Sequence, residues 1–149
     1  MNALRAAAAL LLLATAGCQS TITGEAMLPG VGDAERALVV RYVEDGNAAA
    51  AKGSAAQQEL YRKTQHPDFH SGICQLNGLT VLTEPVWPTL RADPKWSPGG
   101  NAIPPRGNVY VVAVSVSTRR DNTTVGNQIG SQHVVVLNGM AYGFAPCPN

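Results

Sequence analysis

The sequence predicts an α+β fold, in which two N-terminal helices pack on a curved, mainly antiparallel sheet of about four strands. Apolar residues recur at helical spacing only between residues 33 and 61, whereas strand-like runs begin at residue 76, and a hairpin motif lies close to the C-terminus. Helices first and strands afterwards are typical of α+β domains. The 149 residues leave room for a single such domain, which we place at residues 33–149.

Two helices are expected before the sheet. Asp33 can cap a helix over residues 34–52, and Gly53 then ends it. Residues 54–57 have the form of a capping box, serine followed three residues later by glutamine, and open a second helix. Pro67 must stop that helix, because proline lacks the backbone N–H that a helix interior requires.

The expected strands follow from composition and alternation. Residues 76–83 are rich in leucine, valine and threonine, and residues 109–118 alternate so that Tyr110, Val112, Val114 and Val116 fall on one face, which we expect in the core. The polar stretch 119–130 lies between expected strands, and we interpret its Asn-Thr-Thr triplet as turn chemistry. Asn138-Gly139, between strands at 133–137 and 140–145, is the strongest short hairpin motif.

Residues 85–105 hold six of the ten prolines, so we expect a long ordered loop or an excursion at the sheet edge. Trp87, Arg91 and Trp96 lie in this segment and are candidates for a contact with a protein partner. Tryptophan and arginine often carry interface energy, and a proline-stiffened segment loses less entropy on docking. In the alternative, both tryptophans fold back and seal an open end of the domain.

The order of these elements resembles that of the nuclear-transport-factor-2-like, or ketosteroid-isomerase-like, cone fold. The resemblance covers approximately residues 33–146, and its closest feature is the Asn138-Gly139 hairpin followed by the aromatic residues Tyr142 and Phe144. It implies that the helices lie across a curved sheet and that a cone-shaped pocket could hold a small ligand. It assigns no catalytic residue in this chain.

The first 17 residues have the form of a signal peptide. Arg5 precedes an apolar run, residues 6–14, that is too short to span a bilayer core, for which about 20 helical residues are needed. Residues 15–18, Thr-Ala-Gly-Cys, resemble the lipobox of bacterial lipoproteins. The resemblance implies that Cys18 is acylated, with palmitate among the chains, and becomes the new N-terminus. The alternative is an ordinary secretory signal with a chance cysteine.

Lipidation of Cys18 would give a membrane-anchored protein with a tether over residues 18–32. In Gram-negative lipoproteins an aspartate directly after the lipidated cysteine favours retention in the inner membrane. Residue 19 is glutamine here. The resemblance therefore implies an outer-membrane location, facing the periplasm.

Two cysteines remain after Cys18, namely Cys74 and Cys147. An even pair in an oxidising compartment predicts a disulfide bond. Such a bond would restrict the unfolded chain by about 4 kcal/mol in the entropic description. The alternative is a pair of buried, unbonded thiols.

His66, Asp68 and His70 are candidate metal ligands, since imidazole and carboxylate both bind zinc, and His133 could join them from a strand. Pro67 prevents the regular helix that would align His66 with His70. A helix terminus followed by a polar turn is the alternative, and we predict neither a metal nor another cofactor. Asp68 and His133 are also the acid–base candidates, but no catalytic motif accompanies them.

The net charge of +1 and the scattered lysines and arginines argue against nucleic-acid binding. Three classes of function remain. The first is a non-catalytic envelope or secretion accessory that binds a protein partner. The second is a periplasmic immunity lipoprotein that blocks a toxin, and the third is a cone-fold protein that binds or converts a small ligand.

Overall fold

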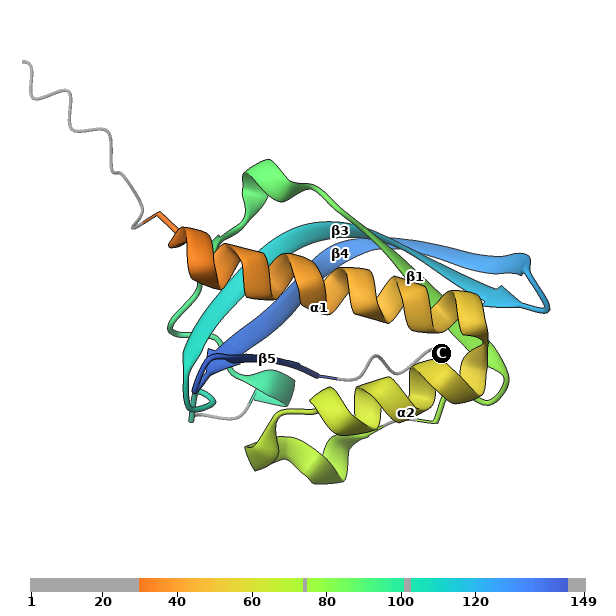
Figure 1. Cartoon of the computed structure of the whole chain (residues 1–149), viewed down its shortest axis with the longest axis horizontal. Helices are drawn as coiled ribbons and strands as arrows, with labels where there is room; N and C mark the ends of the chain where they lie inside the picture. The colour runs from red at the N-terminus through yellow and green to blue at the C-terminus, as the bar shows by residue number, and fades with distance from the viewer. Residues whose placement is uncertain (1–29, 74, 101–102, 145–149) are drawn as a thin grey trace, which may run out of the picture.

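The computed structural model describes residues 30–73, 75–100 and 103–144. Within these ranges the chain forms two helices followed by a curled antiparallel sheet, which confirms the α+β fold expected from the sequence (Figure 1). The helices are α1 (Asp33–Lys52) and α2 (Ser54–Thr64).

The sheet has the strand order β1-β3-β4-β5, and the short β2 also pairs with β3. Every pairing between these strands is antiparallel. The strands are β1 (Leu79–Pro85), β2 (Arg91–Ala92), β3 (Asn108–Arg120), β4 (Thr123–Leu137) and β5 (Met140–Gly143). Three short 3₁₀ helices complete the described elements: η1 (Pro67–Gly72), η2 (Trp87–Thr89) and η3 (Pro98–Gly100). In Figure 1, α1 lies across β3 and β4, and α2 lies below α1, beyond β5.

Both helix starts differ from the expected caps. Asp33 and Ser54 are the first helical residues, and the N-cap positions belong to Gly32 and Gly53, with no capping bond from a side chain. Gly53 has a φ of 110° and serves both helices, because its N–H donates to Ala50 and its carbonyl accepts from the N–H of Gln57. Gly53 is thus both the C-cap of α1 and the N-cap of α2. The prediction that Ser54 and Gln57 form a capping box was wrong.

The strand β4 begins ten residues earlier than residue 133, where we had expected it. The two turn residues, Asp121 and Asn122, both have positive φ, which suits the tight turn of a two-residue hairpin. Residues 123–131 are all exposed, so they show no apolar alternation, and only backbone pairing with β3 defines this part of the strand. The polar stretch 119–130, which we had placed between strands, therefore holds the end of β3, the turn and the first half of β4.

The hairpin at Asn138-Gly139 is confirmed. Both residues have positive φ, and Leu137 pairs directly with Met140 across the turn. The first strand starts at Leu79 instead of residue 76, because a turn with positive φ at residues 77–78 comes before it. The proline-rich segment is an edge excursion that touches the sheet through β2.

The main core lies between α1 and the first half of β3 and the second half of β4. Its buried members are Val39, Tyr42, Val43, Tyr110, Val134 and Val136. Gly143 permits the close contact of β5 with α1, since a Cβ at this position would overlap the Tyr42 hydroxyl. Burial raises the pKa of Tyr42 to about 12.

The outer edge of β1 is closed by side-chain amides from the helices. The Gln57 side chain, which is completely buried, accepts from Val81 N at 2.8 Å and donates to Val81 O at 2.6 Å. Asn47 pairs in the same two-way manner with Thr83, at 2.9 Å and 2.8 Å. Each amide occupies the position that a neighbouring strand's peptide group would take, so the edge backbone keeps its hydrogen bonds without another strand.

We predict that Gln57→Met lowers the free energy of unfolding by about 2–4 kcal/mol, because methionine preserves the volume but leaves the buried N–H and C=O of Val81 without partners. Urea unfolding followed by circular dichroism measures the change. Glu59→Met, on the exposed face of the same helix, is the control and should change the value by less than about 0.5 kcal/mol. Equal losses in the two variants would contradict the role assigned to Gln57.

Candidate functional site

A pocket of about 340 Å³ opens between α2, the sheet and the proline-rich excursion. The described residues of its wall include no lysine, arginine, aspartate or glutamate, so they offer no permanent charge to a ligand. Aromatic rings, valines, small residues and neutral amides share the surface. The lining residues are Tyr61, Val81, Thr83, Trp96, Val114, Val116, Gln128, Gly130, Ser131, Gln132, His133 and Phe144.

Aromatic rings form one wall of this pocket. The Trp96 indole stacks on the His133 imidazole, with ring centroids 4.0 Å apart and planes at 7°, and it meets the Phe144 ring edge-on at 4.8 Å. Flat rings of this kind present a large contact area to a planar or apolar ligand.

Trp87, Arg91 and Trp96 do not meet in one surface. Trp87 is half-buried and packs against the core cluster under α1, whereas Arg91 is exposed on β2. The positions of both tryptophans support the alternative in which they fold back onto the domain. Trp96 thereby becomes part of the pocket wall.

His133 forms a pair with Asp93. The imidazole Nε2 lies 3.0 Å from Asp93 Oδ2, and since an ionised carboxylate only accepts, Nε2 carries the proton. Burial lowers the pKa of His133 below 6.5, against the opposing effect of the Asp93 hydrogen bond. Neutral His133 therefore has a bare Nδ1, which can accept a hydrogen bond.

The segment around Asp93 is held to the sheet. The Asp93 N–H donates to Val109 O at 2.9 Å, and the Asp93 carbonyl accepts from Trp96 N at 3.2 Å. These bonds attach the excursion to β3 and place Asp93 and Trp96 beside His133 of the neighbouring strand β4. The pocket wall is thus held by contacts within the fold.

Gln132 carries the most informative atom of the pocket. Its Oε1 is buried and has no hydrogen-bond partner among the described residues. An unpaired buried acceptor costs about 1–3 kcal/mol, so the fold gains if another molecule supplies a donor. The other such atom in the described chain, Arg119 Nε, lies outside the pocket lining, beside the irregularity in the β3–β4 pairing.

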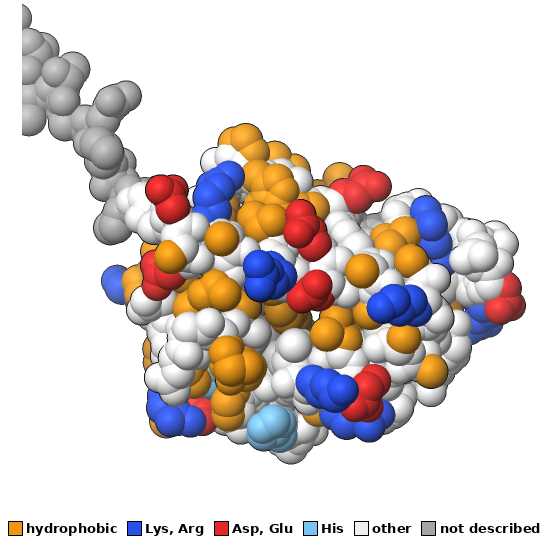
Figure 2. Space-filling view, in the orientation of Figure 1, with side chains coloured by type: hydrophobic (Ala, Val, Ile, Leu, Met, Phe, Trp, Pro, Cys, Tyr) orange, Lys and Arg blue, Asp and Glu red, His pale blue; other side chains and the backbone are white. Residues whose placement is uncertain are grey.

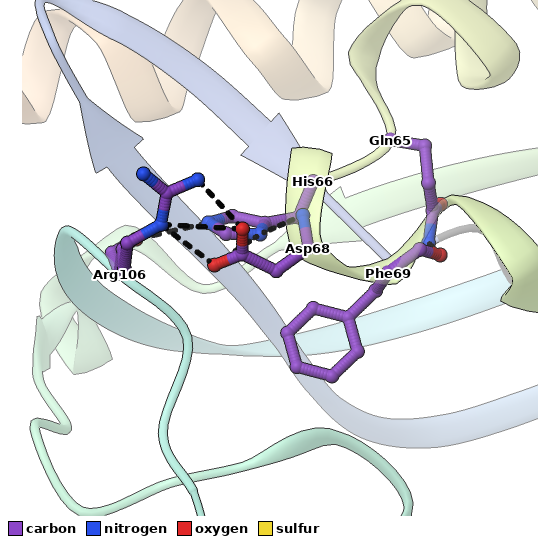
Figure 3. Close-up of polar contacts among 5 residues, drawn as sticks. All are labelled: Gln65, His66, Asp68, Phe69 and Arg106. Carbon is purple, nitrogen blue, oxygen red and sulfur yellow. Dashed lines mark hydrogen bonds and ion pairs between the residues drawn. The ribbon is translucent and has the colours of Figure 1, made fainter.

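The histidine–aspartate cluster that we had considered for metal binding has a structural role. His66 is completely buried, its Nδ1 accepts from Asp68 N at 3.2 Å, and its Nε2 donates to Arg106 O at 2.9 Å (Figure 3). Both ring nitrogens are therefore engaged, and neither has a lone pair left for a metal. His70 is exposed at the end of η1.

Asp68 completes this cluster through a two-pronged ion pair with Arg106, at 2.6–3.2 Å. The hydrogen bonds from Arg106 hold the pKa of Asp68 below its ordinary value. The cluster ties η1 to the segment before β3, and the described residues contain no group of three or more His, Cys, Asp or Glu side chains placed to bind a metal.

Cys18, Cys74 and Cys147 lie outside the described residues, so the lipidation and the disulfide remain predictions. No helix in the described ranges combines the length and the apolar character needed to cross a membrane. On the face that the helices cover, charged side chains of both signs are interspersed without a broad area of either sign (Figure 2).

Comparison of the chain with protein-family models, with curated proteins and with solved structures gives no match. The candidate site therefore stands on its own geometry.

Sequence reasoning identified His133 and Trp96 but missed Gln132 and Asp93. Gln132 lies at the end of a polar run that we had not assigned to a strand. Extending the alternation of residues 134 and 136 backwards would have placed it on the face of the core valines, and this pattern was the available clue. Asp93 gave no comparable clue, because its link to His133 spans 40 residues.

We predict that the stability of the protein falls as the pH is lowered from about 7.5 to 5.5, in part through His133. Its folded pKa lies below the unfolded one, so the unfolded state binds the proton first and gains stability as the pH falls. The melting temperature of His133→Gln should therefore depend less steeply on pH in this window. His70→Gln, at an exposed position, should keep the slope of the parent protein, and equal slopes in all three proteins would refute the prediction.

Proposed function

We propose that this protein is a lipid-anchored envelope module that binds a small, uncharged molecule in the pocket beside His133. Gln132 Oε1, a buried acceptor with no hydrogen-bond partner in the described part of the chain, is the observation that carries the proposal, since such an atom in a pocket wall can accept a hydrogen bond from a ligand. Among the function classes that the sequence left open, this is the third, a protein that binds or converts a small ligand, and we propose binding. The inward position of Trp96 favours it over a surface contact with a protein partner.

The lining defines the chemistry of the ligand. A pocket of about 340 Å³ suits a small organic molecule. The absence of permanently charged side chains from its wall disfavours an ionic ligand, because a buried charge requires a counter-charge. The ring stack and the valines favour an apolar or aromatic body, and Gln132 Oε1 requires a hydroxyl or N–H group on it.

Binding is better supported than catalysis. The Asp93–His133 pair could accept a proton, but the lining residues that the structure describes include no carboxylate that could act with it. Ser131 is the only serine among the described lining residues, and the hydrogen bond that His133 makes there is with Asp93. Burial favours the neutral imidazole, and the hydrogen bond to Asp93 fixes the ring beneath Trp96, which is a positioning role.

The ligand proposal is tested by calorimetry with two probes, 2-naphthol and 2-methoxynaphthalene, which differ in a single hydrogen-bond donor. We expect the parent protein to bind 2-naphthol more tightly, and Gln132→Leu to weaken that binding by about tenfold, the value of one hydrogen bond. Gln132→Leu should leave the affinity for 2-methoxynaphthalene unchanged. Gln128→Leu, on the exposed part of the same lining, is the control and should not change the preference between the probes.

Two results would contradict the ligand proposal. One is a parent protein that binds both probes equally, and the other is a parent protein that binds neither at millimolar concentration. A loss of 2-naphthol binding that is equal in Gln132→Leu and Gln128→Leu would remove the special role of the buried acceptor.

The anchoring proposal rests on the resemblance of residues 15–18 to a lipobox. We expect Cys18→Ala to abolish incorporation of labelled palmitate and to release the protein from the outer-membrane fraction, because the acyl chains would be the only hydrophobic anchor in the proposal. Cys74→Ala is the matched control and should keep the label. Continued labelling of Cys18→Ala would exclude this anchor.

A further inference from the structure

The edge strands β1 and β4 differ in how their outward-facing backbone groups are hydrogen-bonded. Asn47 and Gln57 cover the edge backbone of β1. On its outer side β4 pairs with β5 only from Val134 onwards, so the described residues provide no strand partner for residues 123–133 on that side.

The part of β4 that has no strand partner among the described residues lacks the usual protection against strand pairing. Residues 123–137 contain no lysine, arginine, aspartate, glutamate or proline. A bulge opposite Thr118 and Arg119 interrupts the pairing only near the hairpin tip, and the register with β3 is continuous from Gly126 onwards. Proteins normally protect an exposed edge by charges, prolines or bulges along its length. An edge that remains regular and neutral over residues 126–133 is suited to pairing with another strand.

We propose that two copies of this chain pair antiparallel along this edge, with the two-fold axis at Ile129. A strand that pairs antiparallel with itself obeys two-fold symmetry automatically, so a second copy satisfies the same surface twice. Ile129 is 87% exposed, the highest value among the exposed large apolar side chains of the described chain. It lies close to the middle of the regular free stretch.

The register at Ile129 also matches the neighbouring side chains. Ile129 of each copy lies opposite Ile129 of the other, which covers both apolar side chains. Asn127 then lies opposite Ser131 on both sides of the axis, so polar residues meet polar residues. On the other face of the strand Gln128 lies opposite Gly130, a long side chain beside the smallest residue.

The proposed dimer would also affect the ligand pocket, although the argument for the dimer does not require that the pocket binds a ligand. Gln128, Gly130 and Gln132 line the pocket and belong to the paired stretch. Pairing would hold this wall in a fixed conformation and place the second copy along the pocket rim. Because residues 123–137 contain no lysine, arginine, aspartate or glutamate, this edge gives no electrostatic preference for an acidic or a basic partner. Self-pairing needs only a regular backbone edge and an apolar side chain at the axis, and this edge provides both.

Cysteine cross-linking in the full-length chain tests the register. Two differently tagged proteins, Asn127→Cys and Ser131→Cys, are mixed in detergent micelles and mildly oxidised. In the proposed dimer these positions face each other at a Cα separation of about 5.5 Å, which a disulfide can bridge. We expect a mixed dimer whose bond maps to residues 127 and 131, and little cross-linking of either variant alone, because identical positions are then about 13 Å apart.

A second change separates self-pairing from accidental contact. Adding Ile129→Lys should reduce the mixed cross-link at least tenfold, since it places two positive charges at the axis, while the exposed position leaves the melting temperature unchanged. Val86→Lys, at another exposed apolar position, should leave the cross-link intact. The proposal is overturned by absence of the mixed cross-link, by equal cross-linking of the single variants, by survival of the bond in Ile129→Lys, or by a bond to a different protein.

Discussion

The pairing of two side-chain amides with the edge of β1 is the interaction on which the arrangement of this domain depends. Asn47 from α1 and Gln57 from α2 hold alternate residues of one strand, so each helix is fixed to the sheet by directional bonds as well as by apolar packing. The Gln57 amide also lies 3.0 Å from the Tyr61 hydroxyl, which fixes the ring that α2 contributes to the pocket. Burial raises the pKa of Tyr61, so this ring adds no charge to the pocket wall.

The opposite wall of the pocket depends on the proline-rich excursion. Asp93 connects this segment to β3 through its backbone and to β4 through His133, and Trp96 then covers the imidazole. The prolines limit the conformations of the unfolded segment, which reduces the entropy lost when it is ordered. Helices and excursion thus approach the curled sheet from different parts of the chain, and the pocket lies where they meet.

The sequence was informative wherever a local period or a local turn determines structure. Helical spacing and the Asn138-Gly139 dipeptide correctly predicted both helices and the last hairpin. The first half of β4 was missed, because a strand that is exposed on both faces has no apolar period to detect. The caps were assigned to Asp33 and Ser54, whereas glycine backbone geometry at the adjacent positions supplies the bonds. The Asp93–His133 pair joins distant segments, so no local pattern could reveal it.

Hydrogen-bond satisfaction distinguishes structural polar residues from those available to a ligand. Gln57 and Gln132 are both amides with buried groups, but the amide oxygen of Gln57 is bonded to the backbone, whereas that of Gln132 has no partner among the described residues. His66 uses both ring nitrogens within the fold, whereas the hydrogen bond described for His133 is made by Nε2. From residue type alone, the two glutamines would be equally good candidates for binding a ligand, and so would the two histidines. Because a buried acceptor without a partner is costly, Gln132 Oε1 is the atom at which we propose that a ligand donates a hydrogen bond, and Gln132 and His133 both line the same pocket.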